Sequence, residues 1–190
     1  SFVSMGINVL TYDYRGYGQS SDFSINTKFY IYPQFEKDLN AAIDYVKKYH
    51  SKLRSVNLYG LGIGAALSIG VGVNRPEISK VVADSPYLSL ENVKKLIAQQ
   101  SGTEPLMPIG YNKTVIEPKF ALEAKCGNVN GLLLIYAEND FVYNKKEVKE
   151  ISKIRGGISS TFEIKGSNSY KDNFKTNKEK YFDEIKKFMK

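Results

Sequence analysis

Short clusters of glycine and polar residues follow directly after several apolar runs of this 190-residue chain. They occupy positions 13–16, 60–64, 84–86, 138–140 and 166–173. In parallel α/β sheets, ligands lie beyond the carboxyl ends of the strands, so these clusters are the places to look for chemistry. A tight glycine turn that opens a helix is suited either to presenting a nucleophile or to binding a phosphate through its backbone.

The turn Gly60-Leu61-Gly62-Ile63-Gly64 allows the phosphate-binding interpretation, because Gly60-x-Gly62-x-x-Ala65 matches the dinucleotide fingerprint. Gly62 would then let the backbone approach a pyrophosphate, and Asp84 would contact the ribose. A predicted strand and helix precede the turn, whereas this fingerprint usually opens its domain. A dinucleotide-binding protein of Rossmann type is therefore one alternative.

Nucleophilic catalysis needs an activating base, and the chain has one histidine, His50, and one cysteine, Cys126. His50 ends a predicted helix, away from the carboxyl ends of the strands, and we interpret it as a solvated residue at a helix C-terminus. The candidate displaced nucleophiles are Ser68, Ser85 and Cys126. None of them has a histidine to pair with.

Hydrophobic periodicity predicts the elements that position these clusters. The predicted strands are Ile7–Tyr12, Ser55–Tyr59, Lys80–Asp84, Gly131–Ala137 and Ser160–Lys165; the predicted helices are Tyr30–Tyr49, Gly64–Val73, Leu90–Gln100, Pro118–Lys125, Lys145–Ile154 and Asn177–Met189, with 101–116 irregular. Their alternation predicts a single α/β domain over residues 1–190. We expect a parallel sheet between two layers of helices, with right-handed crossovers.

Four motifs resemble the α/β-hydrolase family, in particular its esterase and peptidase-like members with small lids. NVLTYDYRGYGQS (8–20) is similar to the strand and loop that end in D-x-R-G-x-G-x-S, and VNLYGLGIGAA (56–66) to the G-x-S-x-G-G nucleophile elbow. LLLIYAENDFV (132–142) is similar to the segment that carries the catalytic acid, and 165–188 to the loop and last helix that follow the catalytic histidine. The resemblance implies an α/β-hydrolase fold, a three-layer αβα sandwich.

The resemblance also assigns the positions of the catalytic residues, and two of them carry the wrong side chain. Gly62 stands at the nucleophile position, where the family has serine. An alignment on Asp172 and Phe174 puts Tyr170 at the histidine position, and Asn168 is a second register. Tyrosine, with a pKa of about 10, is a poor general base at neutral pH.

The remaining two positions match the family. Asp140 stands at the position of the acid, and the amide of Ile63 would form one half of the oxyanion hole. An acid that orients a histidine has no task without one, so Asp140 is equally well explained as a turn-former after its strand.

The resemblance further implies that the chain is truncated at its N-terminus and lacks the strand that lies between Ile7–Tyr12 and Ser55–Tyr59 in the family. Either these two strands pair directly, or another chain completes the sheet, or upstream sequence supplies the strand.

These positions predict a catalytically inactive relative, a pseudohydrolase, that binds a small molecule or a protein partner in the cleft. Aromatic and apolar residues near the strand ends are expected to line it: Tyr14, Tyr17, Tyr87, Leu88, Phe141, Tyr143 and Tyr170. The second alternative is an active esterase or peptidase of the family with an unrecognised nucleophile. We expect no cofactor and no metal ion.

Charge and composition exclude several other classes. The net charge is +7, and residues 145–190 hold 13 of the 27 basic and 7 of the 20 acidic residues. Because lysines alternate with acids at helical spacing, we expect solvated helix faces and no nucleic-acid partner. The apolar runs are too short for a membrane span and no targeting leader is visible, which favours a cytoplasmic location. One cysteine excludes an intramolecular disulfide and a cysteine metal cluster.

Overall fold

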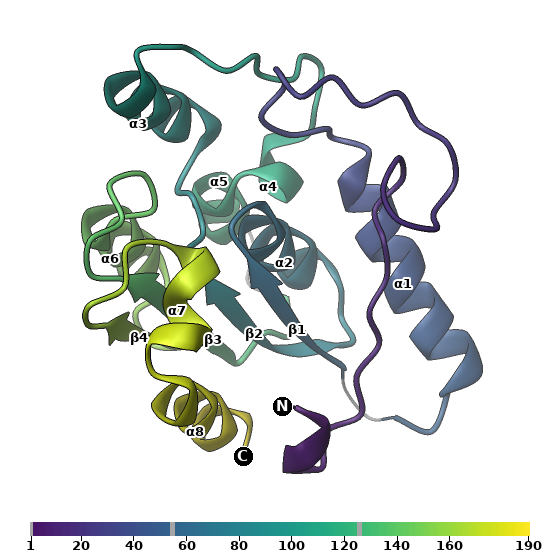
Figure 1. The fold of residues 1–190 in the computed structure, drawn as a ribbon. Helices are drawn as coiled ribbons and strands as arrows, with labels where there is room; N and C mark the ends of the chain where they lie inside the picture. The colour runs from purple at the N-terminus through teal and green to yellow at the C-terminus, as the bar shows by residue number, and fades with distance from the viewer. Residues whose placement is uncertain (1, 54–55, 125–126) are drawn as a thin grey trace.

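The computed structural model describes residues 2–53, 56–124 and 127–190, and these residues form one four-stranded sheet (Figure 1). The strands are β1 (Val56–Leu61), β2 (Ile78–Asp84), β3 (Gly131–Ala137) and β4 (Ser159–Ile164), hydrogen-bonded in the order β1-β2-β3-β4. All three pairings are parallel. The carboxyl ends of the strands therefore share one edge of the sheet, as the sequence predicts.

Helices cover both faces of this sheet and create the three layers. The helices are α1 (Phe35–Tyr49), α2 (Ile63–Asn74), α3 (Leu90–Ser101), α4 (Lys113–Ile116), α5 (Pro118–Ala124), α6 (Lys145–Ile154), α7 (Tyr170–Thr176) and α8 (Lys178–Met189), after a 3-10 turn at Val3–Met5. Successive residues of a strand point to opposite faces. In β3, Leu132 and Leu134 pack with α2, α5 and α6, whereas Leu133 and Ile135 pack with α8. This two-sided burial explains why Gly131–Ala137 is apolar throughout.

The helices differ from the predictions by more than one residue at three places. The helix predicted from Tyr30 begins at Phe35, because Pro33 disfavours helical backbone in the residue before it. The segment 101–116, predicted to be irregular, contains the one-turn helix α4, whose Asn112 side chain accepts a hydrogen bond from the amide of Thr114. The cluster 166–173, predicted as a loop, includes the start of α7 at Tyr170. The predicted ends at Ser55 and Lys125 lie outside the described residues.

The predicted strand Ile7–Tyr12 is wrong. The segment is irregular, and its residues Val9 and Leu10 are 47% and 48% exposed. Within the described part of the chain, the backbone groups of residues 8–13 make no hydrogen bond. A strand requires a hydrogen-bonded neighbour, and none lies beside this segment. Direct pairing of this segment with β1, one of the three alternatives, therefore does not occur among the described residues.

β1 is consequently the edge of the described sheet. The amides of Val56 and Gly62 donate to carbonyls of β2 or the residue before it, at 2.9 and 2.8 Å. Alternate residues of a parallel strand face opposite neighbours, so Asn57, Tyr59 and Leu61 direct their N–H and C=O groups to the outer side. The described residues supply no partner there.

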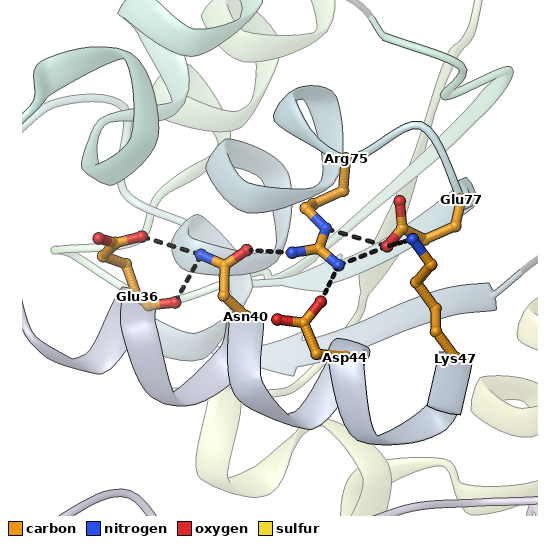
Figure 2. Close-up of polar contacts among 6 residues, drawn as sticks. All are labelled: Glu36, Asn40, Asp44, Lys47, Arg75 and Glu77. Carbon is orange, nitrogen blue, oxygen red and sulfur yellow. Dashed lines mark hydrogen bonds and ion pairs between the residues drawn. The ribbon is translucent and has the colours of Figure 1, made fainter. Parts of the chain in front are cut away.

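A charged network fixes α1 beside the turn between α2 and β2 (Figure 2). The Arg75 guanidinium donates to Glu77 (Nε–Oε1 3.0 Å), to Asn40 of α1 (3.2 Å) and to Asp44 of α1. Lys47 adds a longer ion pair to Glu77, at 3.5 Å. Together with the apolar face of α1, this network attaches the helix to the amino end of β2 (Figure 2).

Candidate functional site

The glycine turn between β1 and α2 has the geometry of a nucleophile elbow. Gly62 precedes α2 with φ 54° and ψ −116°, a left-handed conformation that side chains rarely adopt. A Cβ at Gly60 would lie 2.2 Å from the carbonyl oxygen of Gly64, so that position must also be glycine. The amide of Gly62 donates to the carbonyl of Asp84 (2.8 Å), which fixes the turn at the end of β2.

Tyr170 covers this turn. A Cβ built on Gly62 would lie 3.3 Å from Cζ, 3.4 Å from Cε1 and 3.6 Å from Cε2 of Tyr170. The aromatic ring therefore lies in van der Waals contact with the place where a side chain of residue 62 would begin. The structure brings together the two residues that the resemblance assigned to the nucleophile and histidine positions. Asn168, the second register, is exposed and accepts a hydrogen bond from Asn139 (3.3 Å).

Asp140 lies next to Tyr170 and forms the turn before α6. Its Oδ1 accepts hydrogen bonds from the amides of Val142 and Tyr143, both at 2.9 Å. Burial raises the pKa of Asp140, while the backbone amides of Tyr143, Val142 and Tyr170 act in the opposite direction. These contacts give the carboxylate a structural task, as the turn-former interpretation proposed.

Ile63 is the first residue of α2, and its amide has no acceptor among the described residues. The first amides of a helix lack intrahelical acceptors and can bind an anion. The amides of Ala65 and Ala66 are already engaged by the carbonyl of Gly62. The amide of Ile63 is therefore free to donate, as the half of the oxyanion hole that the resemblance assigned to it would require.

No imidazole reaches the site. His50 caps the C-terminus of α1, is exposed, and precedes the amino end of β1 by six positions. Figure 1 shows α1 ending near that end of β1, whereas Gly62 follows the opposite end. The interpretation of His50 as a solvated helix-end residue agrees with this placement.

The two candidate displaced nucleophiles among the described residues, Ser68 and Ser85, are buried. Ser68 is 3% exposed inside α2, and Ser85 is fully buried. The Ser85 hydroxyl donates to Oδ1 of Asp84 (2.9 Å), and its φ of 59° marks a strained backbone. Cys126 lies outside the described residues. Neither described serine is placed to attack a substrate.

A buried polar network beside the elbow was missed by the sequence analysis. Asp84, Ser85, Asn173 and Tyr181 are all fully buried. Asn173 of α7 and Tyr181 of α8 each donate to the Asp84 carboxylate at 2.6 Å, and the hydroxyls of Tyr181 and Tyr59 are 2.8 Å apart. Burial raises the pKa of Asp84 to about 6, opposed by the bonds from Tyr181, Asn173 and Ser85.

This network corrects the role considered for Asp84. A ribose contact would require an accessible carboxylate, but Asp84 is 0% exposed and already accepts three hydrogen bonds. The signal available in the sequence was only an acid at the end of a buried strand. Its partners lie far away along the chain, so spacing could not reveal them.

Tyrosines fill the space above the strand ends. The rings of Tyr143 and Tyr170 meet edge to face with centroids 5.6 Å apart, and Tyr30 lies 5.6 Å from the buried Tyr87. The hydroxyls of Tyr30 and Tyr143 are 3.0 Å apart. Tyr30 was not among the expected lining residues. Of the residues that were, Tyr87 and Leu88 are buried, Tyr14, Tyr143 and Tyr170 are half-buried, and Tyr17 and Phe141 are exposed.

Two cavities lie away from Gly62. One, of about 210 Å³, is bounded by the start of α1 and residues 110–116. The other is an open groove of about 450 Å³ along α3. Among the described residues, no group of three or more His, Cys, Asp or Glu side chains is placed to hold a metal ion. No helix in the described ranges is long and apolar enough to cross a membrane.

Fold and elbow together define an α/β-hydrolase, and comparison with known proteins gives the family. Residues 1–114 match the model of the serine aminopeptidase S33 family, so the chain belongs to that family. The matched part contains the elbow at Gly62. It does not extend to Asp140 or Tyr170.

Solved structures agree with the fold. An esterase from Pyrococcus furiosus superposes with a TM-score of 0.74 at 18% identity, over 99% of this chain and 72% of that protein. A putative α/β hydrolase from Agrobacterium tumefaciens gives 0.67 at 18% identity, over 99% and 71%. An α/β serine hydrolase homologue from Coxiella burnetii gives 0.59 at 15% identity, over 90% and 64%. No curated protein matches the sequence.

Proposed function

We propose that this chain is a non-catalytic member of the serine aminopeptidase S33 family, which acts by binding a ligand or partner at the rim of its strand ends. The observation that carries the proposal is the Tyr170 ring, which lies 3.3–3.6 Å from the place where a side chain of residue 62 would begin. The elbow keeps a tight glycine turn, but residue 62 has no side chain and the Tyr170 ring lies against it.

The expected loss of rate is large. Removing a catalytic serine or histidine from such a site lowers kcat by about 10⁶. Here both positions lack the catalytic side chain, and His50 lies at the other end of the sheet. An intact oxyanion donor at Ile63 would recover only about 10²–10³. Binding energy at this site therefore has no chemical step to accelerate.

The rim offers a surface for binding. Phe141 is 46% exposed in the loop after β3, next to Asp140, whereas the exposed Tyr17 contacts Phe35 of α1. A large aromatic side chain exposed beside the site is suited to an apolar contact with a ligand or partner. We propose a cytoplasmic location for this activity, in line with the sequence prediction.

Ester hydrolysis with short-chain nitrophenyl esters tests the proposal. We expect the parent chain to show no turnover above buffer. The matched comparison is the double variant Gly62→Ser with Tyr170→His, which restores both side chains and removes the larger ring. Saturable hydrolysis by the parent would refute the proposal. An inactive double variant that still folds would indicate that Asp140 and Ile63 are not positioned for catalysis either.

A further inference from the structure

The buried network around Asp84 connects the two C-terminal helices to the sheet. Of the three groups that donate to the carboxylate, Ser85 is its own neighbour, but Asn173 belongs to α7 and Tyr181 to α8. The first residue of α7 is Tyr170, whose ring covers Gly62. Any motion that separates α7 from Asp84 therefore also moves the residue that closes the elbow.

The closed position of α7 leaves one buried hydrogen-bond acceptor without a partner among the described residues. Oδ1 of Asn173 is buried and has no hydrogen-bond partner in the described part of the chain. An unpaired buried acceptor lowers the stability of the state that contains it. The ionised carboxylate of Asp84 is also kept from water, and burial of a charge is unfavourable even when hydrogen bonds compensate in part. Both groups would gain water if α7 and α8 moved outward.

We propose that Asp84 is a pH-sensitive latch, which holds α7 closed over Gly62 when the carboxyl is neutral and favours its opening when the carboxyl is ionised. The inference rests on the proposed function, because opening exposes the elbow and the amide of Ile63 at the binding site. Linkage sets the direction: an opening that hydrates a carboxylate is favoured by losing the proton.

Burial favours the neutral carboxyl in the closed state, and it outweighs the hydrogen bonds from Tyr181, Asn173 and Ser85, which act in the opposite direction. Tyr181 of α8 and Tyr59 of β1 form a hydroxyl chain that can reverse its proton direction when Asp84 is protonated, since either hydroxyl of that pair can donate. Asp140, after β3, adds repulsion. Because burial raises the pKa of Asp84 to about 6, we expect α7 to open as the pH rises from the ordinary pKa of an aspartate toward neutrality.

The charged side chains of α7 itself point elsewhere. Lys171 and Lys175 are exposed, and Asp172 accepts a hydrogen bond from the Ser169 hydroxyl at the start of the helix. Asp172 is therefore a matched control, a carboxylate on the moving helix that does not touch the network.

Amide hydrogen exchange of residues 170–176, corrected for the intrinsic effect of pH, tests the latch in the intact chain. With the pKa of Asp84 at about 6 when closed and near its ordinary value when open, the opening constant should rise about tenfold from pH 5 to pH 7 and level off above it. Asp84→Asn should abolish the rise, and Asp172→Asn should keep it. A flat profile in the parent, or an unchanged rise in Asp84→Asn, would overturn the proposal.

Tyr181→Phe provides a second test if Asp84→Asn does not fold. Losing this donor removes a group that stabilises the ionised form, so the rise should move to higher pH. An unmoved midpoint counts against the latch. Exchange needs no enzymatic turnover, so ester hydrolysis by the parent would refute the proposed function without altering this result.

Discussion

Gly62→Ala should destabilise the chain for two separable reasons. Its φ of 54° is unfavourable for any residue with a Cβ, and such strain costs about 1–3 kcal/mol. The new methyl would also lie 3.3–3.6 Å from three atoms of the Tyr170 ring, which must shift by a few tenths of an ångström. Overpacking of this kind adds about 1 kcal/mol, the lower end of its range, because the ring is only half-buried.

A double-mutant cycle separates the two contributions. In a Tyr170→Ala background the steric part disappears, so Gly62→Ala should cost about 1 kcal/mol less than in the parent, as measured by urea unfolding. The matched control is Gly64→Ala, where a Cβ would meet only the Tyr14 hydroxyl at 3.8 Å. Because Gly64 lies in α2, alanine there should be neutral or stabilising by up to about 1 kcal/mol.

The cycle has a clear negative outcome. If Gly62→Ala costs the same in both backgrounds, the Tyr170 ring does not occupy the space above residue 62. If Gly62→Ala is as mild as Gly64→Ala, the strained elbow geometry itself is wrong.

Three further predictions concern other parts of the molecule. Arg75→Gln should lower the free energy of unfolding by about 1–3 kcal/mol, because it leaves the half-buried Glu77 with only its longer ion pair to Lys47. Lys47→Gln should change the free energy of unfolding by less than about 0.5 kcal/mol, and equal losses in denaturant unfolding would contradict this. Asp84→Asn should raise the free energy of unfolding by up to about 3 kcal/mol at pH 8 and should not raise it below pH 4. Because burial raises the pKa of folded Asp84 to about 6, the stability that Asp84 gives the parent by binding a proton is complete below the unfolded pKa and is lost as pH rises through 6. A gain in stability seen only at acid pH would contradict this. The outward amides of Asn57, Tyr59 and Leu61 should exchange faster by NMR than those of Leu58 and Gly60, and uniform protection along β1 would show that its outer edge is paired.

Elements with strong periodicity were predicted closely. Gly131–Ala137 and Lys145–Ile154 were predicted with the bounds that they have, since β3 is apolar on both faces and Asn144 caps α6. The segment Ile7–Tyr12 has the same composition as a strand, but strand formation depends on a neighbour that composition does not report. The short helix α4 is capped by Asn112 and α7 is held by the contact of Asn173 with Asp84, and helices of this length leave little periodic signal.

The site divides in the same way. Gly62 and Tyr170 could be named from the sequence because a resemblance supplied their positions, and the structure places them in contact. That the contact closes the site depends on side-chain packing. In the Asp84 network, Asn173 lies 89 positions and Tyr181 97 positions from Asp84 along the chain, so no local sequence pattern contains it.

The central claim is that no nucleophile is available at this elbow. The most direct measurement is the intact mass of the purified parent chain after incubation with an excess of a fluorophosphonate probe, which forms a covalent bond with activated serines. We predict an unchanged mass. A single adduct, lost on denaturation before labelling, would contradict the claim and reveal an activated side chain.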